Sequence, residues 1–139
     1  MAAAPANSFV ISSARYEELK GPLAGFLRAW SKSAEAGKID PKTVAMMVAK
    51  VSPDQFESQL FGESYLGVSI ALNTPITPKY GELQTSVWEN IQKDMIEHDL
   101  LSQAIDVSTF LDSSLIPAAN EFDREQIKAD LAAWAEANK

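Results

Sequence analysis

The single histidine of the chain is the first residue to consider as a source of chemistry. His98 stands between Glu97 and Asp99, with Asp94 four residues before it. An imidazole beside carboxylates can ligate zinc or relay protons, but either role needs further groups at defined spacing. A cationic side chain also interacts favourably with the C-terminal end of a helix. We therefore interpret His98 as a helix-end residue and expect no metal site.

Carboxylates and serines offer no better catalytic pattern. The acidic clusters are Glu17-Glu18, Glu97-Asp99 and Glu121-Asp123-Glu125. Each cluster falls near an expected helix end, where solvated charge is common, so a catalytic pair of carboxylates is not indicated. The serines lack the spacing of a nucleophile elbow, and the glycines never gather into a phosphate-binding loop. We predict that the chain is no enzyme and holds no cofactor.

The composition disfavours several classes of partner. The chain has 139 residues, of which 46% are hydrophobic and 22% charged, so one folded domain is expected. Its net charge of -7 disfavours binding to nucleic acid and to anionic membrane surfaces. No apolar run reaches the ~20 residues that span a bilayer, so no direct membrane insertion is expected. There is no cysteine, which excludes disulfides and thiolate sites.

Helical periodicity dominates the pattern from Ser13 onward. A short helix is expected from that residue to Lys20-Gly21, and a second helix from Pro22 to Gly37. The second helix carries apolar residues at three- and four-residue spacing, which predicts one buried face. These residues are Leu23, Phe26, Leu27, Trp30 and Ala34.

Proline and capping signals mark further helices. Asp40-Pro41 and Ser52-Pro53 each predict a helix start, because a capping side chain precedes a proline at the first helical position. The second of these helices is expected to close at Phe61-Gly62. Residues 63–72 mix helical and extended character, and we favour a helix there.

The clearest amphipathic pattern lies between Pro78 and His98, where a long helix is expected. Its apolar stripe consists of Tyr80, Leu83, Val87, Trp88, Ile91, Met95 and Ile96. Further on, Asp106 introduces a short helical turn, and Asp123 with Gln126 three residues later predicts the capped start of a final helix. Each of the three tryptophans is in phase with its helix's apolar stripe, so we interpret them as packing residues and not as a cage for a cation.

One segment favours a strand. Residues Ser8 to Ser12 are β-prone and are bounded by small polar residues. A lone strand leaves its backbone donors and acceptors unpaired, and no later segment offers a partner strand, which indicates sequence beyond this chain. We predict a mainly α-helical fold with one short N-terminal strand. Residues 1–12 form an extended connector or strand, and residues 13–139 form a single helical domain.

Several stretches of the chain carry a family resemblance. Residues 8–29 order a strand, a short helix and a proline-opened helix, while residues 80–96, Leu100-Leu101 and residues 106–117 end in a proline-containing tail. This order resembles the C-terminal part of the solute-binding proteins of ABC importers, in the nitrate, sulfonate, taurine and thiamine-pyrimidine class with a type II periplasmic-binding-protein α/β fold. The likeness covers nearly all of the chain. Where this chain has Asp99, the family usually has a glycine, and its members are much longer.

The resemblance implies a function and a site. In this family the solute lies between two α/β lobes, near the strands that cross between them, so Asn7, Ser8 and Phe9 are the residues expected nearest to it. Backbone or hydroxyl contacts would come from the first two, and the helices would be scaffold. The implied protein is periplasmic, closes on a small-molecule solute and presents the closed form to ABC permease subunits. Its other partner would be the remainder of the two-lobed protein or another copy.

Two other functions stay open. Relatives of the same class resemble a desulfinase and a thiamine-pyrimidine synthase, so an enzyme on this fold would carry its reactive residues in the lobe outside this chain. A stand-alone helical interaction module would instead set the apolar stripes at residues 83–96 or 131–134 against a partner protein. In that case the strand would be unpaired or formed with a second copy.

Overall fold

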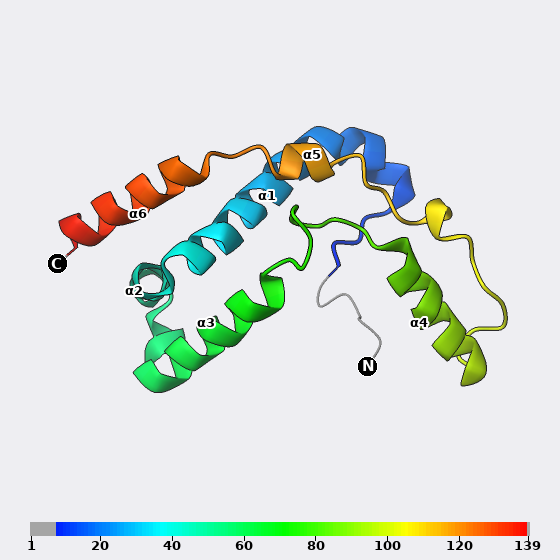
Figure 1. The fold of residues 1–139 in the computed structure, drawn as a ribbon, viewed down its shortest axis with the longest axis horizontal. Coiled ribbons are helices and arrows are strands. Elements are labelled where there is room, and N and C mark those ends of the chain that lie inside the picture. Colours follow the sequence, from blue (N-terminus) through cyan, green and yellow to red (C-terminus); the bar gives the residue numbers. More distant parts are fainter. Residues whose placement is uncertain (1–7, 139) are drawn as a thin grey trace.

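The structure is a computed structural model that describes residues 8–138, and this part of the chain is mainly helical, as predicted. The longest helix, α1 (Ser13–Ile39), is the element on which α2, α3, α5 and α6 pack. The elements after α1 are α2 (Pro41–Val51), η1 (Pro53–Phe56), α3 (Gln59–Asn73), α4 (Thr85–Glu97), η2 (Val107–Thr109), α5 (Ile116–Ala119) and α6 (Arg124–Ala137). In Figure 1, α5 and α6 lie on one side of α1 and α3 lies on the other, while α4 stands apart and packs on η2.

The helix α1 runs without interruption through the predicted break at Lys20-Gly21. Pro22 lies inside the helix, where it lacks the amide that would bond to Glu18. Residues 20–22 are exposed, so water can satisfy the freed carbonyl. A Cβ at Gly21 would meet nothing within 4 Å, so no close contact at this position interrupts the helix. The prediction of two separate helices was therefore wrong.

Gly37 also continues the helix that it was expected to end. It lies in the last turn of α1, two residues before Ile39, and it is buried. A Cβ on Gly37 would stand 3.0 Å from Cγ1 of Ile70 on α3. The glycine therefore allows α1 and α3 to approach closely. The residue that requires this glycine, Ile70, is far away in the sequence.

The first proline-marked helix start is confirmed, whereas the second opens only a short 3-10 turn and lacks the expected side-chain cap. The Asp40 carboxylate accepts a hydrogen bond from the Thr43 amide at 3.0 Å and caps α2. Interactions with the side chain and then the backbone of Thr43 hold the pKa of Asp40 below its usual value. Ser52 caps nothing with its side chain, and Pro53 opens only the short turn η1. Ser58 begins α3 instead, which continues to Asn73.

Gly62 lies in the first turn of α3 and not at the end of a helix. It is buried, and an added Cβ would fall 2.5 Å from Cδ1 of Phe56. The expected close of a helix at Phe61-Gly62 was therefore wrong, whereas the helix favoured for residues 63–72 is confirmed within α3.

The predicted strand at Ser8–Ser12 is wrong, because no strand occurs between residues 8 and 138. A strand needs a neighbour to bond to, and residues 8–12 find none within that range. The backbone at Ser12 is nevertheless extended, with φ -63° and ψ 130°. Phe9 packs its ring edge-on against Phe26 and Trp30 of α1. The segment is an extended connector held to α1 by its aromatic side chain.

The long helix expected from Pro78 begins later, at Thr85, and its end near His98 is confirmed. Tyr80 precedes the helix in a turn and is buried, because the side chain of Asn120 accepts from its amide at 2.8 Å and donates to its carbonyl at 3.0 Å. After the helix, Asp99 adopts φ 57°, the left-handed backbone that glycine adopts without steric cost. The predicted turn after Asp106 is confirmed as η2.

The final helix begins as predicted. The carboxylate of Asp123 accepts from the amides of Glu125 at 2.8 Å and Gln126 at 3.3 Å, and α6 follows. Ile127 and Leu131 are buried against the rest of the chain. No helix in the described range is both long and apolar enough to cross a bilayer.

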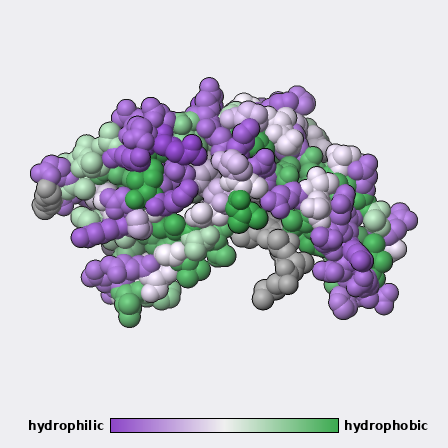
Figure 2. All heavy atoms as spheres, in the orientation of Figure 1, coloured by the Kyte–Doolittle hydropathy of each residue, from purple (hydrophilic) through white to green (hydrophobic). Residues whose placement is uncertain are grey.

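The buried core is small, and much apolar surface remains outside it. The buried apolar residues among those described are Tyr80, Val107, Ala119, Ile127 and Leu131. The largest uncovered group lies on α3, where five large apolar side chains are between 59% and 77% exposed. They are Leu60, Phe61, Tyr65, Val68 and Leu72. Figure 2 shows hydrophobic residues gathered over this helix.

Replacing either of the two glycines of α3 with alanine should change the free energy of unfolding, in opposite directions. Gly62→Ala should lower the free energy of unfolding by about 1–3 kcal/mol, because the methyl group would overlap the Phe56 ring. Gly67→Ala, where a Cβ meets nothing within 4 Å, should raise it by about 1 kcal/mol through helix propensity. Urea denaturation of the two variants measures both; equal shifts would contradict the packing of Phe56 on α3.

Candidate functional site

The predicted solute-contacting residues lie at the start of the described chain. Asn7 falls outside the described residues. Ser8 and Phe9 are exposed on the extended segment before α1. The structure brings Phe9 together with aromatic residues of α1, with ring centroids 5.3 Å from Phe26 and 5.4 Å from Trp30. Phe9 is thus part of a packed group.

That group continues into the interior as a chain of edge-on and tilted aromatic contacts. The Trp30 ring lies 6.3 Å from the ring of Tyr80, which lies 6.4 Å from that of Phe122. Such edge-on pairs are favourable because the positive edge of one ring meets the negative face of the other. We call Phe9, Phe26, Trp30, Tyr80 and Phe122 the aromatic chain. It connects the exposed segment to the buried centre of the molecule.

A buried carboxylate lies at the inner end of the aromatic chain. Glu35 of α1 is 4% exposed and accepts a hydrogen bond from the Tyr80 hydroxyl at 2.8 Å. Its other oxygen accepts from Nε of Arg124, the first residue of α6, at 3.1 Å. Both carboxylate oxygens therefore have a donor, as a buried charge requires. We call these three residues the Glu35 node.

The Glu35 node is suited to holding the fold together. Burial, and then the hydrogen bond and charge of Glu35, raise the pKa of Tyr80 above its ordinary value of 10.0. The phenol therefore stays protonated at neutral pH and serves as a donor, not as a base. One signal for this node could be found in the sequence: Glu35 follows Leu27 and Ser31 at four-residue spacing, on the inward face of α1.

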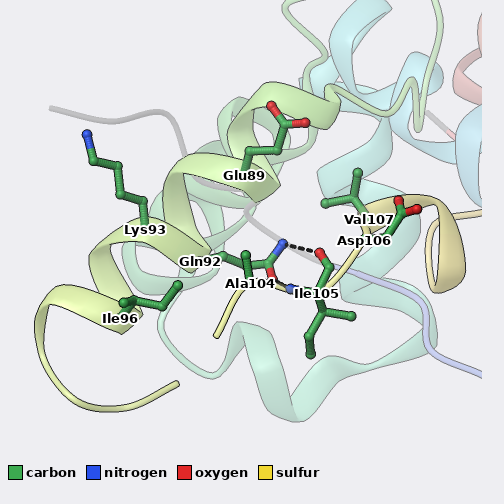
Figure 3. A pocket seen from close by; sticks show the side chains of 8 residues that line it. All are labelled: Glu89, Gln92, Lys93, Ile96, Ala104, Ile105, Asp106 and Val107. Atoms are coloured by element: carbon green, nitrogen blue, oxygen red, sulfur yellow. Dashed lines mark hydrogen bonds between the residues drawn. The ribbon is translucent and has the colours of Figure 1, made fainter. Parts of the chain in front are cut away.

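One hollow of about 330 Å³ lies between α4 and the segment before η2 (Figure 3). In this hollow the side-chain amide of Gln92 bonds to the backbone of Ile105. Nε2 of Gln92 donates to the Ile105 carbonyl at 3.0 Å, and Oε1 of Gln92 accepts from the Ile105 backbone amide at 2.6 Å. Figure 3 shows the charged ends of Glu89 and Lys93 extending away from this pair and from each other. Polar groups that converge on a ligand are the mark of a small-molecule site, and they are lacking among these residues. The Gln92 bonds fasten the segment to α4.

A second hollow of about 330 Å³ opens beside the apolar face of α3. Val48 of α2 and Phe56 of η1 form one wall, and Phe61, Tyr65 and Leu66 of α3 form the other. The rings of Phe61 and Tyr65 are stacked with centroids 6.3 Å apart. This hollow is apolar and continuous with the exposed face of α3, so it is suited to contact with an apolar surface.

The other residues considered for catalysis, metal binding or cation binding are dispersed over the structure. The backbone amide of His98 caps the end of α4 by donating to the Asp94 carbonyl, which agrees with its interpretation as a helix-end residue. Between residues 8 and 138 no three His, Cys, Asp or Glu side chains gather as metal ligands would. The tryptophans lie on different helices, with Trp88 against Phe110 and Trp134 beneath Lys50, so they form no common cage.

Comparison with known proteins adds no relative to these observations. No protein-family model matches the chain, and the searches of curated proteins and of solved structures found no match. The family resemblance therefore rests on the residues and turns of the chain itself. The aromatic chain, the Glu35 node and the face of α3 are the features on which a function has to be argued.

Removing the Tyr80 hydroxyl tests the Glu35 node. Tyr80→Phe should lower the free energy of unfolding by about 1.5–3 kcal/mol, because Glu35 loses one of its two donors. The raised pKa of Tyr80 makes its contribution complete below pH 10 and progressively lost above it. Urea denaturation between pH 7 and 11 should show a steeper alkaline loss in the original chain than in the variant.

Tyr65→Phe is the matched control, since Tyr65 is exposed on α3 and its ring contact with Phe61 survives the change. It should leave stability and its pH dependence unchanged. If Tyr80→Phe and Tyr65→Phe behave alike across this pH range, the Glu35 node does not hold the fold.

Proposed function

We propose that the chain is the C-terminal part of the periplasmic solute-binding protein of an ABC importer, in the nitrate, sulfonate, taurine and thiamine-precursor class. Its helices would form one side of a type II two-lobed α/β fold, and its partners would be a small-molecule solute and the permease subunits. Capture of this kind needs shape and hydrogen-bond donors, not a nucleophile.

The observation that carries this function is the apolar character of α3 on both faces. One face packs on α1, α2 and η1, and the opposite face exposes five large apolar side chains. Glu63 is the single charged residue among the 15 residues of the helix. A helix with large apolar side chains on two opposite faces belongs inside a larger body, as the helices of an α/β lobe do.

The backbone at Asp99 is a second support. Before paired leucines the family usually has a glycine, and Asp99 adopts the positive φ of 57° at that place. Glycine takes this conformation freely, and aspartate is among the few other residues that tolerate it. The departure from the family in residue type is therefore compatible with a backbone conformation that glycine adopts readily.

Phe9 is the residue of this chain that we place nearest to the solute. It is exposed on one side and packs on Phe26 and Trp30 on the other, so a fixed aromatic edge faces the surroundings. Ser8 precedes it on the same extended segment and would offer a hydroxyl or backbone contact. The Glu35 node and the helices around it would be the scaffold that sets the position of this segment.

A helical interaction module is the second candidate, and the same face of α3 favours it. In that function a partner protein would cover Leu60, Phe61 and Val68, and no solute would bind. The stripes considered from sequence lie on α4 and α6, whereas the most exposed apolar face lies on α3. An enzyme on the two-lobed fold would hold its reactive residues outside this chain and would release a product.

Thermal denaturation of the natural gene product with candidate solutes tests capture. Nitrate, taurine, other alkyl sulfonates and the pyrimidine precursor of thiamine are the panel. One of them should raise the midpoint of unfolding, since a ligand at 100 times its Kd adds about 2.7 kcal/mol to the stability of the folded state. Phe9→Ala should reduce the shift, and Val51→Ala, on the exposed end of α2, should leave it intact.

Two results would contradict solute capture. If no solute of the panel changes the midpoint, the helical module is favoured. If a solute is converted to a product that mass spectrometry detects, the protein is an enzyme on the same fold.

A further inference from the structure

The exposed face of α3, at the lower edge of the molecule in Figure 1, carries a regular stripe of large side chains. They recur at alternating four- and three-residue spacing, so they follow one line along the helix. We call them the large stripe, which consists of Phe61, Tyr65, Val68 and Leu72. Each of these residues is more than half exposed. This spacing is typical of a helix that packs along another helix.

A line of small residues runs beside the large stripe. We call it the small stripe, and it consists of Ser64, Gly67 and Ala71, all of which are exposed. A Cβ at Gly67 would meet nothing within 4 Å, so the groove along the small stripe is open there. A ridge of large side chains on one helix packs into such a groove on another. The helix α3 therefore carries both halves of a ridge-and-groove contact.

The charge of α3 also permits two copies to meet. The chain has a net charge of -7, but the large and small stripes contain no charged residue. Glu63, the one charged residue of the helix, lies at the edge of this face, where it accepts a hydrogen bond from the Gln59 side chain at 2.9 Å. Contact between two copies of this face therefore brings no like charges together at its centre.

The exposed surface of the chain is large for its mass. It amounts to 9722 Å², whereas a folded monomer of 15.2 kDa exposes about 7,100 Å². The excess of roughly 2,600 Å² is greater than the ~800 Å² that each partner buries in a standard protein interface. The chain therefore has enough uncovered surface for a stable dimer.

We infer that a second copy of the chain covers this face, with the two α3 helices antiparallel about a two-fold axis. A two-fold contact presents the same surface twice, so the large stripe of each copy packs on the small stripe of the other. The facing pairs are Phe61 with Ala71, Tyr65 with Gly67, and Val68 with Ser64. This inference goes beyond the proposed function, because association through α3 neither supplies nor requires a solute.

Other arrangements use less of this face. A parallel pair of α3 helices would set each residue against its own copy, so the large stripes would meet and the grooves at Gly67 would stay unfilled. An anionic membrane would attract the apolar stripe but would repel a chain of net charge -7. The antiparallel pair fills both grooves and brings together only uncharged residues.

Sedimentation equilibrium of the 139-residue chain, measured without solute, tests the association. A contact between two helices is small, so we expect a dissociation constant on the order of 10 μM. The mass should rise from 15.2 kDa at low concentration to twice that value at saturation. A mass of 15.2 kDa at every concentration would overturn the inference, and so would continued growth beyond the dimer.

Gly67→Leu tests the groove. The new side chain meets nothing in the single chain but takes the space of Tyr65 from the second copy, so association should weaken about 10- to 100-fold. Gly25→Leu is the matched control, because Gly25 is also helical and exposed and its Cβ would meet nothing within 4 Å. Equal dissociation constants of the two variants would contradict the groove contact.

Urea denaturation below the dissociation constant checks that both variants are folded. There the chain is dissociated and α3 is exposed, so neither leucine should lower the free energy of unfolding. A loss of association by a folded Gly67→Leu chain supports the interface. A folded chain that still dimerises with the original affinity overturns it.

Cross-linking tests the direction of the two helices. The chain has no cysteine, so Ser64→Cys and Val68→Cys each introduce a single thiol. Under mild oxidation a mixture of the two variants should form disulfide-linked dimers roughly tenfold or more faster than either variant alone, because only the facing positions lie within disulfide reach. Faster cross-linking of each variant with itself would indicate a parallel pair and overturn the antiparallel arrangement.

Discussion

The hydrogen bonds that converge on Glu35 hold three distant parts of the chain together. They join α1 to the turn that carries Tyr80 and to the start of α6 at Arg124. A carboxylate this deeply buried is tolerated only when its oxygens accept hydrogen bonds. Glu35 therefore requires both of its donors, Tyr80 and Arg124. Asn120 fixes the backbone of the same turn. The relative positions of α1, the turn that carries Tyr80 and the start of α6 therefore follow from one buried charge and the groups that satisfy it.

Away from this node the chain buries little apolar surface of its own. Full burial of a large apolar side chain contributes about 1.5–3 kcal/mol, and five such side chains on α3 are more than half exposed. This free energy is available to whatever covers the helix. A solute-binding protein in which these helices support a second layer of structure uses that surface, and so does an interaction module with a partner.

Local signals in the sequence were sufficient for the capped helix starts and insufficient for anything that depends on distant contacts. Asp40 and Asp123 cap the helices that their spacing predicts, because a cap involves residues only two or three positions apart. Gly37 was misread as a helix end because its close neighbour, Ile70, is far away in the sequence, whereas Gly21 was misread although it has no neighbour within 4 Å. The placement of Phe9 near a solute rests on the family resemblance and stays a prediction. Tyr80 was assigned to a helix because its aromatic side chain fits the apolar stripe, although its burial depends on Glu35 and Asn120.

The central claim, that α3 is enclosed by further structure in the natural protein, is tested most directly by a lysine on its outer face. Val68→Lys should change the stability of the recombinant 139-residue chain by less than about 0.5 kcal/mol, because Val68 is exposed there. In the natural gene product the same substitution should cost several kcal/mol, on the order of 3–5, because it would bury an unpaired charge. Ala132→Lys on the exposed side of α6 is the control and should have little effect in either protein. A thermal midpoint of the natural product that Val68→Lys leaves unchanged would contradict the claim.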